Sequence, residues 1–276
     1  EGYTVENISN ELYKASDFTF SGNKEVKGTD AGTYAMNLKA ADFKNTNKNF
    51  SKVTFVVTDG KLEITKRNVT LKSASASKEY DGNKLVSGTV SVTGDGFADG
   101  EGATYDVTGS QTNVGKSDNE FTYTLNEGTK VANYDIKTEK GTLEVTPVTS
   151  EVVVTVTENS KEVTYDGEEK SVDGYKVKSI SNDLYTADDF RFNGKAEVNG
   201  TDAGTYDMEV KASDFENISN NFSKVKFVVE NGQLVINKRN VTLTSANDEK
   251  VYDGTALTNG KVTVGGDDFA DGEGAT

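Results

Sequence analysis

The chain has 276 residues and a formal net charge of −15, from 45 acidic and 30 basic residues. A field of this sign repels phosphate backbones and acidic membranes, which argues against nucleic acid as a partner. Histidine, cysteine and tryptophan are all absent, so disulfides, thiolate chemistry, imidazole bases and the usual zinc ligands are excluded. No apolar run has the length of a membrane span, and we expect no membrane insertion in this segment.

In chain order, the first predicted elements are short helices in residues 9–15 and 41–49, with Ser9 as a candidate cap of the first. Their later copies are residues 181–187 and 212–220. No other stretch has a helical pattern. The sequence therefore predicts a mostly β chain with at most one short helix in each such region.

Strands are predicted wherever β-branched residues alternate with polar ones, as in residues 53–57, 61–65 and 151–156. Asp-Gly at 59–60 separates the first two of these runs, and Asn-Gly at 231–232 stands at the equivalent later position. Both dipeptides tolerate the positive φ angles of a two-residue turn. We therefore expect a tight hairpin at each place.

A long repeat runs through the whole chain. Residues 66–71 recur without change as residues 238–243, an offset of 172 (239 − 67 = 172). Residues 28–34 and 97–104 recur with the same offset. Self-similarity at a fixed period is the signature of a repeat architecture.

A weaker repeat lies inside the long one. Tyr-Asp-Gly occurs at residues 80, 165 and 252, at spacings of 85 and 87 (165 − 80 = 85; 252 − 165 = 87). The pair Asn49-Phe50 also matches Asn133-Tyr134. Each long unit is therefore two diverged modules, which we call A and B.

The predicted boundaries give an N-terminally incomplete first A module, a first B module of the Tyr-Asp-Gly type, a complete second A module and a C-terminally incomplete second B module. They span residues 1–66, 67–148, 149–238 and 239–276. We expect the chain to be a window on a longer array. No Gly/Ser-rich or Pro-rich linker separates the modules, so small β-sandwich or β-grasp-like modules are expected end to end as an elongated rod.

The candidate sites have simpler structural readings. Tyr-Asp-Gly is expected to be a turn whose tyrosine is anchored in the core. Residues 95–101 superficially resemble a calcium loop, but Phe97 occupies a ligand position, so a polar hairpin loop is expected and weak calcium binding stays open. Repeated Asn-x-Ser/Thr triplets are poor evidence for glycosylation. A Lys–Asn isopeptide bond would need a lysine, an asparagine and a buried carboxylate in contact, and the sequence does not identify three such residues. We assign no catalytic, cofactor-binding or metal-binding residue, and we do not expect an enzyme.

Taken together, the strand at 68–71, the Tyr80-Asp81-Gly82 turn, the loop at 97–100, the Asn113-Val114-Gly115 turn and the closing strand at 141–147 resemble the YDG/MBG-type repeats of large bacterial surface proteins and adhesins. The resemblance covers essentially the whole chain. It implies secretion, attachment to a bacterial cell surface or wall, and tandem presentation.

The leading hypothesis is a stalk or fibre segment of a secreted surface adhesin, whose partners are the neighbouring repeats of the same chain. The alternatives are a module that binds a host glycan or protein, and a filament subunit that associates laterally or end to end. Exposed tyrosines gathered on one face would favour the binding module, whereas tyrosines buried at equivalent positions would count against it.

Overall fold

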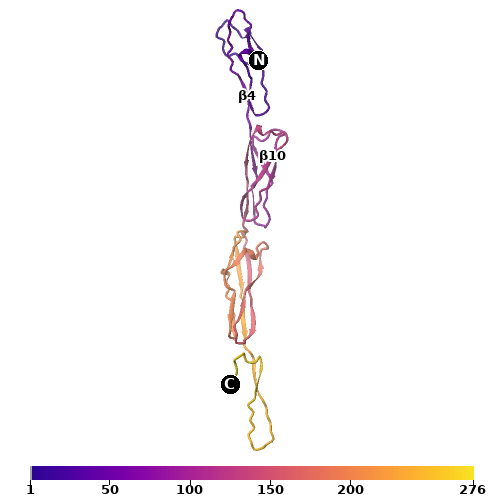
Figure 1. The fold of residues 1–276 in the computed structure, drawn as a ribbon, viewed down its shortest axis with the longest axis vertical. Helices are drawn as coiled ribbons and strands as arrows, with labels where there is room; N and C mark the ends of the chain where they lie inside the picture. Colours follow the sequence, from indigo (N-terminus) through magenta and orange to yellow (C-terminus); the bar gives the residue numbers. More distant parts are fainter. Residues whose placement is uncertain (1) are drawn as a thin grey trace. The chain divides into compact units, whose positions relative to one another are not determined.

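The computed structural model describes residues 2–276, which form short β-strands joined by loops (Figure 1). Strands make up 42% of the chain, and no helix in the described part reaches seven residues. The predicted mostly β architecture of tandem small modules is therefore confirmed. The chain divides into two compact units, the first of which is Glu1–Lys78, Lys84–Gln111 and Gly115–Glu144, and the second Glu79–Asn83, Thr112–Val114 and Val145–Thr276.

The first half of the chain carries strands of three to seven residues. They are β1 (Phe18–Phe20), β2 (Gly32–Ala35), β3 (Phe43–Asn45), β4 (Lys61–Ile64), β5 (Arg67–Ser73), β6 (Ala76–Glu79), β7 (Val90–Gly94), β8 (Ala103–Val107), β9 (Gly115–Asp118), β10 (Phe121–Leu125), β11 (Tyr134–Glu139) and β12 (Thr142–Thr146).

The first A module contains two antiparallel pairs, β1 with β3 and β2 with β4. In the first B module, β5 is the centre of a three-stranded sheet, parallel to β11 and antiparallel to β7. β12 is the centre of a second sheet between β6 and β9, and β8 pairs with β10. The first strand of this module is therefore the parallel neighbour of its last strand but one, β11.

The second half of the chain carries the remaining strands. They are β13 (Val152–Glu158), β14 (Lys161–Thr164), β15 (Lys170–Asp173), β16 (Tyr175–Ile180), β17 (Phe190–Phe192), β18 (Glu197–Gly200), β19 (Gly204–Asp207), β20 (Phe215–Asn217), β21 (Val225–Glu230), β22 (Gln233–Asn237), β23 (Val241–Ser245) and β24 (Val262–Gly266).

The second A module repeats the plan of the first B module. β13 lies between antiparallel β16 and parallel β21, while β22 lies between parallel β14 and antiparallel β19. Two antiparallel pairs, β15 with β18 and β17 with β20, complete the module. The chain thus passes directly from one of these sheets to the other at two places, from β13 to β14 and from β21 to β22.

The predicted hairpin at residues 231–232 is wrong. β21 and β22 belong to different sheets because each finds a parallel partner in β13 or β14, and neither Asn231 nor Gly232 has a positive φ. The hairpin at residues 59–60 is also absent, since residues 53–57 form no strand.

A buried polar group marks the point where the chain passes between sheets. In the second A module this is Glu158, which is 2% exposed. One carboxylate oxygen accepts a hydrogen bond from Val210 N at 2.8 Å and the other from Gly232 N at 2.6 Å. A Cβ atom on Gly232 would lie 2.3 Å from Asn159 O. Glycine is required here because two backbones approach within contact distance.

In the first B module the buried polar residue at the equivalent passage between sheets is neutral. Ser73, which is 1% exposed, donates to Asn119 O at 2.6 Å and accepts from Gly141 N at 2.9 Å. A Cβ on Gly141 would meet Ala74 at 2.4 Å. Gly141 and Gly232 therefore share one structural role, which is close approach of two chain segments and not a turn.

The helices expected at residues 9–15 and 41–49 and in their copies are not formed. Each is replaced by a three-residue 3-10 helix with the sequence pattern Ala-x-Asp before a phenylalanine, and one further turn, η3 (Val131–Asn133), precedes β11. The four are η1 (Ala15–Asp17), η2 (Ala40–Asp42), η4 (Ala187–Asp189) and η5 (Ala212–Asp214).

The aspartate is the last residue of each of these turns, and its carboxylate caps the start of the turn by accepting the backbone N–H three residues earlier, as in Lys14 N to Asp17 at 2.7 Å. Ser9 caps nothing in the described structure, and its copy Ser181 instead accepts a hydrogen bond from Val153 N in β13 at 2.8 Å. The helical alternative of a β-grasp-like module is therefore not observed.

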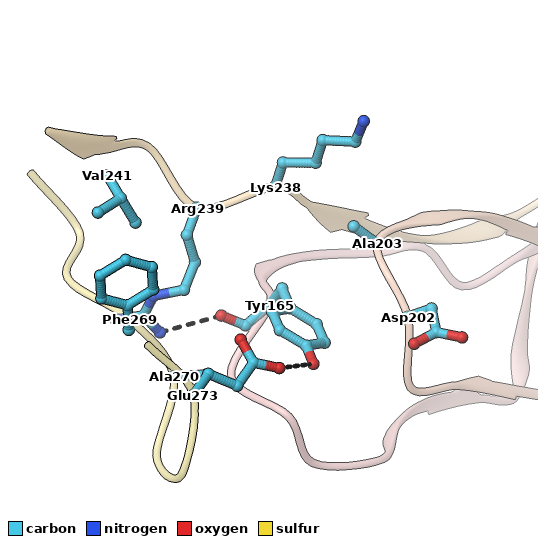
Figure 2. A pocket seen from close by; sticks show the side chains of 9 residues that line it. All are labelled: Tyr165, Asp202, Ala203, Lys238, Arg239, Val241, Phe269, Ala270 and Glu273. Carbon is cyan, nitrogen blue, oxygen red and sulfur yellow. Dashed lines mark hydrogen bonds between the residues drawn. The ribbon is translucent and has the colours of Figure 1, made fainter. Parts of the chain in front are cut away.

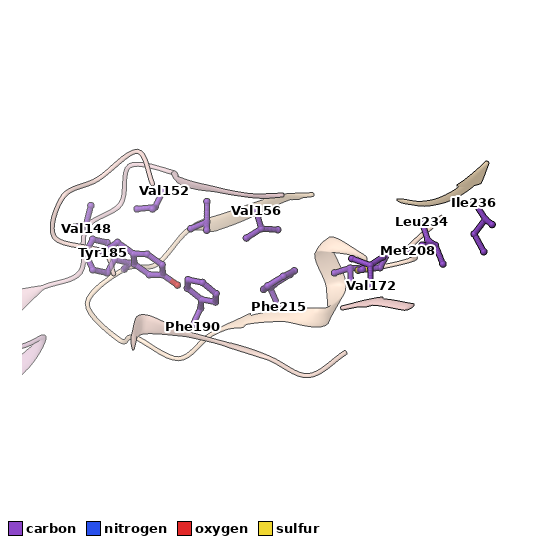
Figure 3. Packing of buried hydrophobic residues seen from close by; sticks show 13 residues of the cluster. Val148, Val152, Val156, Val172, Tyr185, Phe190, Met208, Phe215, Leu234 and Ile236 are labelled. Atoms are coloured by element: carbon purple, nitrogen blue, oxygen red, sulfur yellow. The ribbon is translucent and has the colours of Figure 1, made fainter. Parts of the chain in front are cut away.

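The hydrophobic core is deepest in the second A module (Figure 3). The burial of β13 alternates along the strand, with Val152, Val154 and Val156 completely buried, as expected for a strand with one face against a core. Phe190 and Phe215 are 7% and 6% exposed. Their counterparts in the first A module, Phe18 and Phe43, are only partly buried.

Candidate functional site: an asparagine clasp at the module junctions

One asparagine joins the first A module to the first B module. Asn133 Oδ1 accepts a hydrogen bond from Ala31 N at 2.8 Å, and Asn133 Nδ2 donates to Asp30 Oδ1 at 3.0 Å. Lys130 Nζ adds an ion pair to Asp30 Oδ2 at 2.8 Å. A single side chain therefore satisfies both a backbone donor and a side-chain acceptor of the preceding module.

The ion pair sets the pH range of this contact. The hydrogen bond from Lys130, joined by one from Asn133, holds the pKa of the Asp30 carboxyl below its usual 3.8. The same contact with Asp30 raises the pKa of Lys130 above its usual 10.5. The ion pair therefore stabilises the junction at pH values between the pKa of Asp30 and the pKa of Lys130. Its contribution is lost as the pH falls through the lowered pKa or rises through the raised one.

The same arrangement joins the first B module to the second A module. Asn221 Oδ1 accepts from Val114 N at 2.9 Å, and Asn221 Nδ2 donates to Asn113 Oδ1 at 3.3 Å. We call this pattern the asparagine clasp: the side chains of Asn133 and Asn221 each bind the loop of the preceding module through one accepted and one donated hydrogen bond. The clasp is found both where a B module follows an A module and where an A module follows a B module.

The loop that the clasp binds is built by the repeated segment at residues 28–34. The Tyr34 ring lies over Gly28, where a Cβ atom would come within 2.3 Å of it, and the Tyr34 hydroxyl donates to Asp30 O at 2.8 Å. Tyr206 makes the same bond to Asp202 O at 2.9 Å. The fold of this loop is therefore fixed locally, and it presents Asp30 and Ala31 to the clasp.

An aromatic residue follows each clasp asparagine and anchors it. Tyr134 is 4% exposed, and its hydroxyl donates to Glu101 Oε2 at 2.5 Å and accepts from Ala98 N at 3.0 Å. Phe222 is 3% exposed and packs edge-on against Tyr80 with ring centroids 5.7 Å apart. Burial of the ring fixes the position of the asparagine beside it.

The Tyr-Asp-Gly turns form as predicted. Gly82, Gly167 and Gly254 have φ angles of 78°, 84° and 77°, and each aspartate accepts a hydrogen bond from the backbone N–H two residues later, the geometry of an Asx turn. The tyrosines at 80 and 165 pack against the core of the second A module. Tyr252 differs, because it is 92% exposed.

A third junction, between the second A module and residues 239–276, lies within the second unit. Arg239 donates to Tyr165 O at 3.0 Å, and the Tyr165 hydroxyl donates to Glu273 Oε1 at 2.6 Å (Figure 2). These residues line a pocket of about 290 Å³ together with Asp202 and Ala203, the counterparts of the residues that Asn133 binds.

The loop at residues 95–101 is a structural loop in this chain. Asp95 accepts from Asn68 N at 2.8 Å, and Glu101 accepts from Tyr134. Across residues 2–276 no group of three or more acidic side chains is arranged to hold a metal ion. In the same part of the chain no lysine is buried, so the structure identifies no set of lysine, asparagine and buried carboxylate that could form an isopeptide bond.

The clasp asparagines were not predicted as functional residues. The sequence showed that Asn49-Phe50 matches Asn133-Tyr134, but a repeated asparagine has many structural uses, and no sequence signal states which loop it binds. Its partners, Asp30 and Asn113, lie about one module earlier in the chain, so only the structure brings them together.

The model of the MBG domain family matches residues 2–66 and 152–238, which together are more than half of the chain. No curated protein and no solved structure matches it. Among the described residues no helix has the length and hydrophobicity to span a lipid bilayer. The MBG family is a non-catalytic repeat family typical of surface proteins. This chain, with its tandem all-β modules, belongs to the MBG domain family.

Proposed function

We propose that this chain is a stalk segment of a secreted bacterial surface protein, in which the modules hold a distal domain away from the cell. The observation that carries the proposal is the asparagine clasp, which joins A to B through Asn133 and B to A through Asn221 with the same two hydrogen bonds. Two successive junctions that are bonded in the same way restrict the reorientation of neighbouring modules.

The tyrosines support a structural role over ligand binding. Tyr13 and Tyr185 are 7% and 2% exposed and occupy equivalent positions of the two A modules. The Tyr185 hydroxyl donates to Asn217 Oδ1 at 3.0 Å, as that of Tyr13 does to Asn45 Oδ1. These rings complete cores, so they offer no stacking surface to a glycan.

Small-angle X-ray scattering tests the proposal on this chain and on a version with a second copy of residues 67–238 inserted after residue 238. A stalk predicts that the maximum dimension increases in proportion to the number of modules while the cross-section stays constant. A double variant with Asn133→Ala and Asn221→Ala should lose part of that increase. A compact particle whose dimension does not increase with module number would overturn the proposal.

A further inference from the structure

The second A module contains three Asn-Gly dipeptides, at residues 193–194, 199–200 and 231–232. In such a dipeptide the glycine nitrogen can attack the asparagine Cγ, because glycine has no side chain to hinder the approach and lets the backbone rotate into it. The attack requires a glycine N–H that is free of hydrogen bonds and a backbone that can turn. The three sites differ in both respects.

At two of the three sites the glycine N–H is held. Gly232 is buried, and its N–H donates to Glu158 Oε2 at 2.6 Å. Gly200 belongs to β18, which pairs with β15. The hydrogen bond from Gly174 N to Ala196 O at 2.8 Å fixes which residues of β18 face β15, and the alternation of an antiparallel pair makes Gly200 one of them. Attack at either site therefore requires that a strand pair or the core first opens.

The dipeptide Asn193-Gly194 is the open site. Both residues are exposed, and they follow the end of β17. Asn193 N donates to Asp214 O at 2.7 Å, whereas within residues 2–276 the Gly194 N–H donates to no backbone or side-chain acceptor. The Asn193 side chain donates to Glu216 Oε2 at 3.1 Å, an exposed hydrogen bond that water can replace. The attacking nitrogen is therefore free in the native fold.

We propose that Asn193 is a site of spontaneous deamidation. The Gly194 nitrogen bonds to Asn193 Cγ, the Cγ–Nδ2 bond breaks, and Nδ2 leaves as ammonia with the proton that the Gly194 nitrogen releases. Water then opens the resulting succinimide: its hydroxyl adds to one of the two carbonyl carbons, and the ring nitrogen takes back a proton. The products are aspartate and isoaspartate. The only co-reactant is water, and the inference does not depend on the stalk function.

The products change both the charge and the backbone at the end of β17. Asn193 Nδ2 and Arg191 Nε both donate to Glu216 Oε2, at 3.1 and 2.8 Å. After deamidation a carboxylate faces Glu216 in place of the amide donor, so two negative charges share one guanidinium. Isoaspartate also adds one carbon to the backbone next to Phe192, whose ring packs against Phe215 with centroids 4.9 Å apart. We therefore expect the pair of β17 and β20 to loosen.

Peptide mapping by mass spectrometry, on the 276-residue chain incubated at mildly alkaline pH, tests the proposal. Conversion at Asn193 should be at least about tenfold faster than at Asn199 or Asn231, which corresponds to an opening free energy of about 1.4 kcal/mol. In denaturant the three sites should react at similar rates, because every N–H group is then released. Equal rates in the native chain, or no conversion at Asn193 under conditions where the denatured chain reacts, would overturn the proposal.

The protecting hydrogen bond at the buried site can be removed by substitution. Glu158→Ala frees the Gly232 N–H, so it should raise the rate at Asn231 and leave the rate at Asn193 unchanged. An unchanged rate at Asn231 in this variant would contradict the assignment of reactivity to the free glycine N–H.

The first A module supplies a matched control for the consequence. Ser21 occupies the position of Asn193, and its N–H donates to Asp42 O at 2.9 Å, as that of Asn193 does to Asp214 O. Asn193→Ser should therefore keep the native fold. During incubation, hydrogen exchange at the amides of β20 should become faster in the native chain and stay constant in this variant. Equal acceleration in both chains would refute Asn193 as the origin of the loosening.

Discussion

Asn133 and Asn221 make the same two hydrogen bonds, one at a junction where a B module follows an A module and the other where an A module follows a B module. Each accepts a backbone N–H from the loop of the preceding module, that of Ala31 or of Val114, and each donates to the side chain one residue earlier. The bound loops have different sequences, since one contains aspartate and the other asparagine. The junction therefore depends on the asparagine and on loop geometry more than on the identity of the module.

Replacement of Asn221 by alanine should loosen one junction selectively. The Val114 N–H loses its acceptor, and an unsatisfied donor that is shielded from water costs about 1–3 kcal/mol. We expect faster hydrogen exchange at the Val114 amide and a lower free energy of unfolding for the second A module. Asn220→Ala, at the exposed neighbouring position, is the control, and equal effects of the two variants would contradict the role of the clasp.

Alanine at Gly232 and at Gly60 should have different effects although the two positions are equivalent. At Gly232 the new Cβ would lie 2.3 Å from Asn159 O, whereas at Gly60 its nearest neighbour would be Met36 at 3.8 Å. Overpacking of this kind costs about 1–3 kcal/mol, while Gly60→Ala should change stability by less than about 0.5 kcal/mol. Chemical denaturation followed by tyrosine fluorescence measures both. Equal tolerance at the two positions would contradict the strand-crossing geometry.

Glu158→Ala should destabilise the second A module strongly. The change removes the acceptors of the Val210 and Gly232 N–H groups at a buried position, and two unsatisfied donors together cost roughly 2–6 kcal/mol. Thermal unfolding of the variant should show an early transition for this module. Glu151→Ala, at an exposed site, should unfold like the native chain. If Glu158→Ala also unfolds like the native chain, the stabilising role of the Glu158 carboxylate is refuted.

The second A module should lose stability at alkaline pH. Burial, with a smaller contribution from Asp189, raises the pKa of Tyr185 to about 12 from its usual 10.0. A raised pKa means that its contribution is complete below pH 10.0 and is lost as the pH rises toward 12. Denaturant midpoints measured across this range should fall, and Tyr185→Phe should flatten the fall. An unchanged pH profile in that variant would assign the effect to other groups.

The sequence predicted the architecture well because its main signals are local or repeated. Alternating β-branched residues identified strands, and the fixed offset identified the repeat. The Tyr-Asp-Gly turns were predicted because their Asx geometry lies within a few residues. Short-range chemistry of this kind is visible without a structure.

The failures have a common cause in long-range pairing. Asn231-Gly232 has the composition of a hairpin turn, but β21 and β22 pair with β13 and β14 about 73 residues away (225 − 152 = 73). Glycine at this position serves a close approach that no local rule can detect. The asparagine clasp was missed for the same reason, since its partner loop is a module away in sequence.

The parallel pairing of β13 with β21 and of β14 with β22 has a consequence for a chain under tension. A pull enters the second A module at the start of β13 and leaves it at the end of β22, so it slides neighbouring strands past one another. The hydrogen bonds of both ladders then resist the load together, whereas a hairpin pulled from its open end yields one bond at a time. Resistance to force is set by the rate of this shearing step and not by equilibrium stability, so a module of modest core can still be a mechanically strong link.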